Sequence, residues 1–265
     1  GRYIEFKVYS LTYNEFLQFH KLEDSSDSFT KFYKFGGLPY LINLPFNELL
    51  VSDYLRSIYD TIILKDVVNR YNIRNVRQLQ DLTIYLADTI GNLFSANKIS
   101  EYLKSQRVDL PPKTILEYLT YLNNAYFVKR LRPADIQGKR QFQIGEKYYF
   151  EDLGIRHAIR PFRPNDIGQV LENIVCHHLL VNGYNLSVGR DGDREIDFVG
   201  EKDEKIYVQV AYSVMDPKTH EREFGNLLAI KDNYPKMVIT MDELEGSSYE
   251  GIKQIPIRKF LREFK

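Results

Sequence analysis

The pattern of apolar and polar positions predicts helices and strands along the whole chain. Apolar residues recur at helical spacing over 47–68, beginning with Leu50, and again over 76–90. Residues 2–8 alternate apolar and polar positions, as a half-buried strand does. Residues 24–31 are polar and rich in Ser and Asp, which favours a loop or an exposed link. The first third of the chain is therefore predicted to be one strand followed by helices that pack on a core.

The next stretch has the pattern of a winged helix. Two short helices joined by a polar turn are followed by two strands, with a basic, glycine-containing loop between the strands. The helices are predicted at 95–103 and 113–122, the strands at 126–131 and 147–150, and the loop at 137–140. Six side chains near the starts of these helices and in the loop would face a DNA duplex: Asn97, Lys98, Lys113, Thr114, Lys139 and Arg140. Winged helices also dock proteins, so protein docking stays open as an alternative.

The C-terminal third alternates helices and strands. The predicted order is a helix at 166–182, strands at 185–188, 195–199 and 206–211, a helix at 221–233, strands at 236–240 and 255–257, and a helix at 258–264. Together with the preceding segments this predicts an α+β fold. Its parts are a helical segment, a winged helix-turn-helix and an α/β domain.

Three positions in this last part could carry chemistry. Glu172 lies on the first helix, Asp197 on the second strand and Gln209 on the third. A helical Glu followed by Asp and then Glu/Gln-x-Lys on adjacent strands is the layout of Mg²⁺-dependent phosphodiester hydrolysis, where carboxylate oxygens hold Mg²⁺ or Mn²⁺. Glu172 and Asp197 are the candidate metal ligands, and Glu172, Asp197 and Gln209 are the candidate catalytic residues.

The candidate site departs from that layout at two positions. Gln209 is a neutral amide where a second strand carboxylate is usual, and Ala211 stands where the lysine is usual. Losing a positioned charge of this kind typically lowers a rate by about 10²–10³. Lys231 is a candidate substitute for the lysine, and Arg190 and Arg194 are others. We therefore expect a degenerate site that does not cut, with an active nuclease as the alternative.

Composition and charge narrow the picture. The chain of 265 residues holds 36 basic and 36 acidic side chains, so net charge suggests no partner. Residues 98–163, however, hold 13 basic and 7 acidic side chains, a balance of +6 that could meet nucleic acid. Cys176 is the single cysteine, which excludes an internal disulfide and favours a reducing cytoplasm. No P-loop motif occurs, and no apolar run is long enough to predict a membrane span.

These features together resemble the C-terminal region of bacterial and archaeal AAA-type P-loop ATPases. The resemblance rests on short motifs along nearly the whole chain: Leu-Thr-Tyr-Asn-Glu-Phe at 11–16, Gly-Gly-Leu-Pro at 36–39, Tyr-Tyr-Phe-Glu-Asp-Leu-Gly at 148–154, Leu-Glu-Asn at 171–173, Glu-Ile-Asp-Phe at 195–198 and Tyr-Val-Gln-Val-Ala at 207–211. In that family this region is a domain of unknown function with a winged helix and a restriction-endonuclease-like domain of the PD-(D/E)XK type.

The resemblance implies a division of the chain and a partner. Residues 1–20 would be the end of an ATPase domain, 21–91 a helical segment, 92–163 the winged helix and 164–265 the restriction-endonuclease-like domain. ATP would bind in an N-terminal half that is missing here, and that ATPase domain would be a partner. The leading hypothesis is a DNA-binding effector module whose nuclease-like domain is inactive. The alternatives are a Mg²⁺-dependent DNA nuclease and a protein-interaction module of the ATPase.

Overall fold

The computed structural model describes residue 4 and residues 6–45, 47–136, 145–244 and 246–265, and it is a mixed α+β fold. Its α-helices are α1 Tyr13–His20, α2 Ser26–Phe35, α3 Glu48–Thr61, α4 Val76–Asp88, α5 Ala96–Ser105, α6 Pro112–Asn124, α7 Leu153–Ile159, α8 Ile167–Val181, α9 Pro217–Leu228 and α10 Ile257–Glu263. Short 3₁₀ turns lie at Pro39–Asn43 and Pro164–Asp166, and a π-helical stretch at Ile62–Asn69 continues α3.

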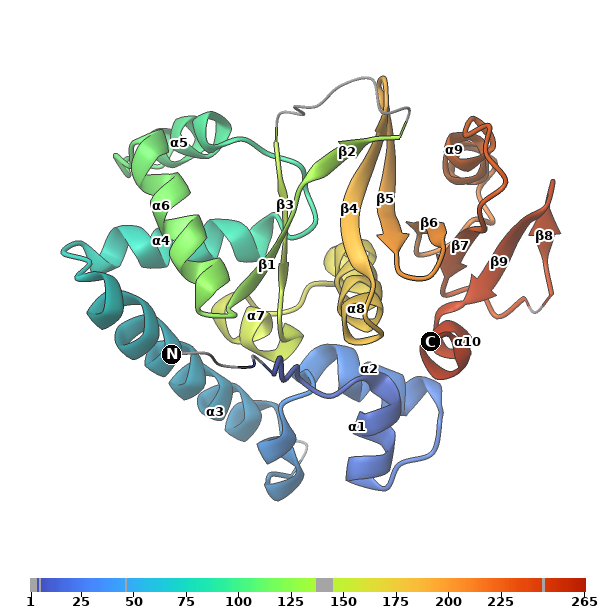
Figure 1. Cartoon of the computed structure of the whole chain (residues 1–265). Coiled ribbons are helices and arrows are strands. Elements are labelled where there is room, and N and C mark those ends of the chain that lie inside the picture. The colour runs from blue at the N-terminus through green and yellow to red at the C-terminus, as the bar shows by residue number, and fades with distance from the viewer. Residues whose placement is uncertain (1–3, 5, 46, 137–144, 245) are drawn as a thin grey trace.

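The strands form two sheets. They are β1 Val128–Leu131, β2 Pro133–Asp135, β3 Lys147–Phe150, β4 Asn185–Asp191, β5 Arg194–Glu201, β6 Lys205–Val210, β7 Lys236–Thr240, β8 Ser248–Tyr249 and β9 Ile252–Pro256. β1 and β3 pair antiparallel as a separate ribbon. The other seven strands form one mixed sheet in the order β2-β4-β5-β6-β7-β9-β8. β2 follows β1 directly and pairs with β4, so it joins the ribbon to the large sheet (Figure 1).

The two faces of the large sheet pack on different helices. On one face, Phe198, Val208 and Ile239 belong to the main apolar core, which also contains the buried side of α8 and α10. On the other face, Tyr207 and Val238 pack with Phe224 and Leu227 of α9 in a smaller core. The α8–β4–β5–β6–α9–β7 order predicted from the alternating pattern is therefore observed, although α9 ends at Leu228, before its predicted end.

The long helix over 47–68 is confirmed, but the side that it buries differs from the prediction. Leu50 is 49% exposed, whereas Val51, Leu55, Tyr59 and Ile63 are almost fully buried. The buried positions repeat every four residues. The last of them, Ile63, lies in the π-helical stretch, where the turn is wider because hydrogen bonds join residues five apart.

Two predictions for the N-terminal part are wrong. The expected loop over 24–31 contains the first turns of α2, in which the Ser25 side chain accepts from the Ser28 N–H as an N-cap, and Phe29 is buried. Among the described residues of the expected strand over 2–8, none forms a strand. The described apolar side chains, Ile4, Phe6 and Val8, are 81%, 83% and 93% exposed, so they do not pack on the core.

The expected helices and strands over 95–150 are present. α5 begins after the N-cap Ser95, α6 begins at Pro112, and the β1–β3 ribbon follows. Figure 1 shows α5 and α6 at the edge of the molecule opposite α9 and β8. The expected loop at 137–140 lies outside the described residues. No helix in the described part of the chain is both long enough and apolar enough to cross a bilayer.

Acid should weaken the fold through His177, which lies in the middle of α8. His177 is buried and approaches the Ser10 hydroxyl at 3.2 Å, and burial followed by the neighbouring His178 lowers its pKa from 6.5 to about 4. Between pH 6.5 and 4 only the unfolded chain takes up this proton, so stability falls as the pH falls. We expect His177→Gln to reduce the stability lost between pH 7 and pH 5 by about 2 kcal/mol, measured by urea unfolding. Equal losses in both proteins would contradict this assignment.

Candidate functional site

A lysine on β3 is the centre of the most charged buried cluster. Successive side chains of a strand point to opposite faces, so Lys147 and Tyr149 face α8 and β5, while Glu146 and Tyr148 face the other way. The Lys147 side chain is 3% exposed. Its position on a short, fully buried strand leaves its ammonium no route to solvent, so it must find anionic partners inside the fold.

Three carboxylates surround the Lys147 ammonium. Its Nζ lies 2.7 Å from Glu172 Oε1 on α8, 2.9 Å from Glu195 Oε1 on β5 and 3.4 Å from Asp197 Oδ1 on the same strand. The Tyr149 hydroxyl also donates to Glu172 Oε1. We call Lys147, Glu172, Glu195 and Asp197 the acid–lysine cluster. It fastens the β1–β3 ribbon to α8 and to the large sheet.

The protonation of the acid–lysine cluster follows from its burial and its charges. Burial alone would lower the pKa of Lys147, but Glu172, Asp197 and Glu195 outweigh it and raise that pKa. Burial raises the pKa of Glu172 to about 7 against the opposing effect of Lys147, and it also raises the pKa of Asp197. Lys147 is therefore charged at neutral pH, and Glu172 takes up a proton at a higher pH than a solvated glutamate does.

The second half of the site lies where β5 and β6 separate. The backbone pairing of these strands begins at Phe198 and Val208. Beyond that point side chains replace the ladder: the Asp197 N–H donates to Gln209 Oε1 at 2.6 Å, and the Val210 N–H donates to Asp197 Oδ2 at 2.9 Å. This fork joins Asp197 to Gln209, and Lys147 joins Asp197 to Glu172.

Both polar atoms of the Gln209 amide are hydrogen-bonded to protein groups. While its Oε1 accepts from Asp197, its Nε2 donates to Glu223 Oε2 on α9 at 2.7 Å, and Gln209 and Glu223 are both buried. Glu223 also pairs with Arg222. A carboxylate at position 209 could not donate to Glu223 and would repel it. The surroundings of position 209 therefore require an amide, and the amide oxygen already accepts a hydrogen bond from Asp197.

In the described structure these residues are not arranged around a divalent cation. Mg²⁺ needs several free oxygen ligands in near-octahedral geometry. In the described ranges no group of three or more His, Cys, Asp or Glu side chains is arranged to hold a metal ion. Instead the ammonium of Lys147 lies among Glu172, Glu195 and Asp197 and balances part of their negative charge. The arrangement can clasp three elements together without a metal.

The three candidate substitutes for the missing lysine differ in where they lie relative to the acid–lysine cluster. Lys231 is exposed, follows the end of α9, and makes no contact with the acid–lysine cluster within the described residues. Arg194 pairs with Asp191 at 3.6 Å. Arg190 donates to Glu195 Oε2 at 3.0 Å and so reaches the edge of the cluster. Ala211 is buried at the end of β6.

The candidate DNA-contacting residues gather on α5 and α6. Asn97 and Lys98 are exposed on the first turn of α5, Lys113 is exposed at the start of α6, and Thr114 beside it is half-buried. The other two candidates, at positions 139 and 140, lie outside the described residues. Ser95 accepts from the Lys98 N–H as the N-cap of α5, which fixes the direction of that turn.

The positive balance of residues 98–163 is not one surface patch. Six of its thirteen basic side chains pair with carboxylates inside the structure: Arg130, Arg132, Lys147, Arg156, Arg160 and Arg163. Two more lie outside the described residues. The remaining five, which have no ion pair in the part of the chain that the structure describes, are Lys98, Lys104, Arg107, Lys113 and Lys129. Four of them lie on or next to α5 and α6.

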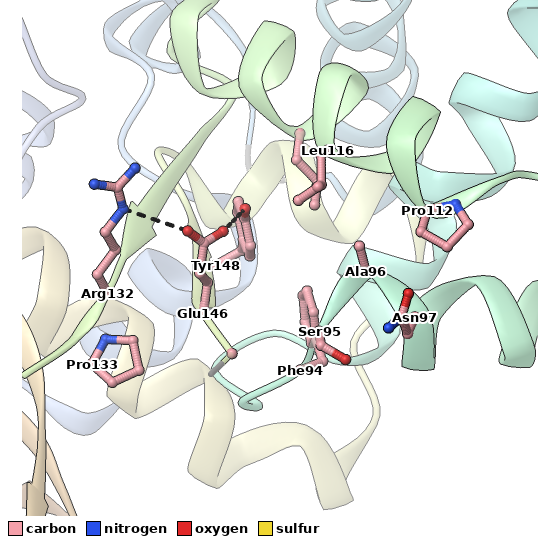
Figure 2. Close-up of a pocket in the computed structure, with 12 residues that line it drawn as sticks. Phe94, Ser95, Ala96, Asn97, Pro112, Leu116, Arg132, Pro133, Glu146 and Tyr148 are labelled. Atoms are coloured by element: carbon pink, nitrogen blue, oxygen red, sulfur yellow. Dashed lines mark hydrogen bonds and ion pairs between the residues drawn. The ribbon is translucent and has the colours of Figure 1, made fainter. Parts of the chain in front are cut away.

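A cavity of about 590 Å³ lies between the starts of these two helices and the ribbon. Figure 2 shows Asn97 and Pro112 on one side of it and Arg132, Glu146 and Tyr148 on the other. Glu146 accepts from Tyr148 and pairs with Arg132 at 3.5 Å. The cavity and the acid–lysine cluster therefore use opposite faces of β3.

Sequence reasoning did not single out Lys147, Glu195, Glu223 or Tyr149. One signal was present: Glu195 and Asp197 are two residues apart on one strand, so both point to the same face. A second was the lysine within the otherwise apolar strand Lys-Tyr-Tyr-Phe, because a lysine at a buried position requires an acidic partner.

Comparisons with known proteins find two relatives whose names give no function. It is 38% identical over 267 residues to an "Uncharacterized protein" of Haemophilus influenzae, covering 98% of this chain. It is 27% identical over 276 residues to another of Methanocaldococcus jannaschii, covering 97% of this chain. The chain spans 65% and 60% of the lengths of these two relatives. No solved structure matches it.

A family match covers the helical segment, α5, α6, the ribbon and α7. It extends over residues 26–166, more than half of the chain. Those residues contain Asn97, Lys98, Lys113 and Lys147, but they end before Glu172 and Asp197. The chain belongs to the family described as Domain of unknown function (DUF8612).

Proposed function

We propose that this chain is a DNA-binding effector module and that duplex DNA meets the exposed side of α5 and α6. The observation that carries the proposal is the set of exposed cations without an ion pair in the described structure: Lys98, Lys104, Arg107 and Lys113. A helix pair followed by an antiparallel ribbon is the arrangement of a winged helix, in which the second helix enters the major groove. Asn97 and Thr114 would then lie beside the duplex.

The acid–lysine cluster supports a non-catalytic role for the restriction-endonuclease-like part. Glu172, Asp197 and Gln209 match the nuclease layout in the sequence, but Lys147 pairs with the carboxylates and the amide of Gln209 is committed to Asp197 and Glu223. Such a cluster holds the ribbon against the sheet and so transmits movement of one to the other. We infer that this part couples DNA binding to the rest of a longer protein.

The longer protein is proposed to be an AAA-type ATPase. The motifs at 11–16, 36–39 and 148–154 resemble the C-terminal region of that family, and both relatives extend beyond the part that this chain matches. ATP would be bound by the remaining part of such a protein.

The test is fluorescence anisotropy of a labelled duplex, titrated at several salt concentrations without divalent metal. We expect binding with a log–log salt slope of about −3 to −6, because roughly three to seven phosphates would be contacted. Lys98→Glu with Lys113→Glu should weaken binding at least about tenfold, since each substitution reverses a phosphate contact. The matched control is Lys218→Glu with Lys253→Glu, which changes the same charge on α9 and β9, far from α5.

Absence of duplex binding at about 50 mM salt, where phosphate contacts are strong, would overturn the proposal and make protein docking the leading function. So would an equal loss of affinity in the control variant.

One observation favours the nuclease as a second candidate. Lys147 lies 2.7 Å from Glu172 and 3.4 Å from Asp197, where its ammonium could take the part of the lysine that position 211 lacks. Cleavage of supercoiled plasmid in Mg²⁺ or Mn²⁺ that disappears in Asp197→Ala would establish this activity and replace the non-catalytic role.

A further inference from the structure

A second basic surface lies along β1. Two adjoining cavities of about 580 and 340 Å³ share Lys7, Tyr9, Asn123 and Lys129 in their linings. The larger one is also lined by Arg130 and Arg132. We call the surface formed by these six residues the basic groove. Because the cavities share four lining residues, they form one continuous depression along β1.

The charge of the basic groove is strongly one-sided. Lys7, Lys129, Arg130 and Arg132 contribute four cations, and the one carboxylate among the described residues that line the two cavities is Glu151. Glu151 is largely buried, and burial raises its pKa while Lys129 opposes that shift. Arg130 and Arg132 share Glu146 at 3.8 and 3.5 Å, and the Arg132 side chain is still 70% exposed. The groove therefore presents a net positive surface to solvent.

The other residues of the groove are those that contact unpaired bases. Tyr9 lines both cavities, and Tyr126, which is 56% exposed, lines the smaller one beside the groove. Asn123 and Asn124 add amide groups to the lining of the smaller cavity. Bases stack on aromatic rings and bond to amides only where they are not paired in a duplex. A positive groove with aromatic side chains is the usual surface for a single strand.

We propose that the basic groove binds single-stranded nucleic acid, with the phosphodiester backbone along Lys7, Lys129 and Arg132. Arg132 also lines the cavity at the starts of α5 and α6, so the groove and that cavity meet at this one side chain (Figure 2). The site is separate from the duplex-binding side of α5 and α6, and it does not depend on it.

The test compares two charge-matched double variants on labelled 12-nucleotide oligo(dT) at 50 mM salt. Lys129→Glu with Arg132→Glu should lower affinity for the single strand at least about tenfold. It should also reduce the log–log salt slope by about 1.4, since two phosphate contacts are lost at about 0.7 each. Lys98→Glu with Lys113→Glu, on the duplex side, should change single-strand affinity less than about threefold. All four substituted side chains are exposed or half-buried, so we expect each variant to fold. Circular dichroism would check this.

A third variant tests stacking. Tyr126→Leu should weaken binding of oligo(dT) about fivefold or more and leave binding of an abasic oligomer of the same length unchanged, because only bases stack on the ring. No single-strand binding by the unaltered chain would overturn the proposal. So would equal loss in both double variants. Competition by polyglutamate as strong as by oligo(dT), with no effect of Tyr126→Leu, would instead identify an acidic peptide as the occupant and also overturn it.

Discussion

Replacing Lys147 with methionine should destabilise the fold by about 3–5 kcal/mol. Methionine has a similar length but no charge, so Glu172, Glu195 and Asp197 would remain close together without the cation that lies 2.7, 2.9 and 3.4 Å from them. Removing one partner of a buried ion pair leaves uncompensated charge at this cost. Urea unfolding at pH 7 measures the change.

The pH dependence of this variant gives a second test of the same cause. The pKa of Glu172 is already raised to about 7, and it should rise further when Lys147 is lost. Acid then neutralises the repelling carboxylates in the folded variant, so its deficit should shrink between pH 7 and pH 5. Adding Glu172→Gln to Lys147→Met should recover part of the loss for the same reason.

The matched control is Lys205→Met, which removes another lysine from a strand of this chain. Lys205 pairs with Glu201 at 3.6 Å, but their side chains are 31% and 62% exposed. Such a surface pair contributes about 0–1 kcal/mol. If Lys147→Met cost no more than Lys205→Met, the acid–lysine cluster would not be the clasp described above.

Lys147 also shows where prediction from the sequence stops. The strand Lys-Tyr-Tyr-Phe and the helix and strand that carry Glu172 and Asp197 were all predicted, because each has a local pattern of apolar and polar residues. The contact of Lys147 with Glu172 and Asp197 was not predicted. These residues lie 25 and 50 positions from Lys147 in the sequence, and no local pattern indicates which faces pack together. From the sequence alone, a substitute for the lysine that position 211 lacks could be sought only on nearby segments of the chain.

The charge of the middle segment shows the same limit. Counting side chains over 98–163 cannot distinguish Lys113, which is exposed, from Arg156, which is fully buried. Residues 24–31 give the opposite case: their polar composition indicates a loop, but Phe29 and Phe32 lie three residues apart and anchor α2 on the core. Composition describes an average over a segment, whereas packing is decided by the few positions that face the core.

Arg156→Met should destabilise the fold by about 3–5 kcal/mol, because Arg156 joins three helices from a fully buried position. Its Nε donates to the Ala87 carbonyl of α4 at 2.9 Å, and its Nη2 donates to Asp166 Oδ2 at 2.9 Å, just before α8. Methionine would leave both acceptors without this donor.

Two measurements distinguish the ion pair of Arg156 from simple packing: the pH dependence of Arg156→Met in acid, and a comparison with Arg163→Met. Burial would raise the pKa of Asp166, but Arg163 and Arg156 outweigh it and lower the pKa below 3.8. Asp166 therefore stabilises the fold above about pH 4, and that stabilisation is lost as the pH falls further. The deficit of Arg156→Met should accordingly shrink below pH 4. Arg163→Met removes the other partner of Asp166 from a side chain that is 47% exposed, so it should cost much less. Equal losses for the two variants in urea unfolding would show that burial of Arg156 does not set its contribution.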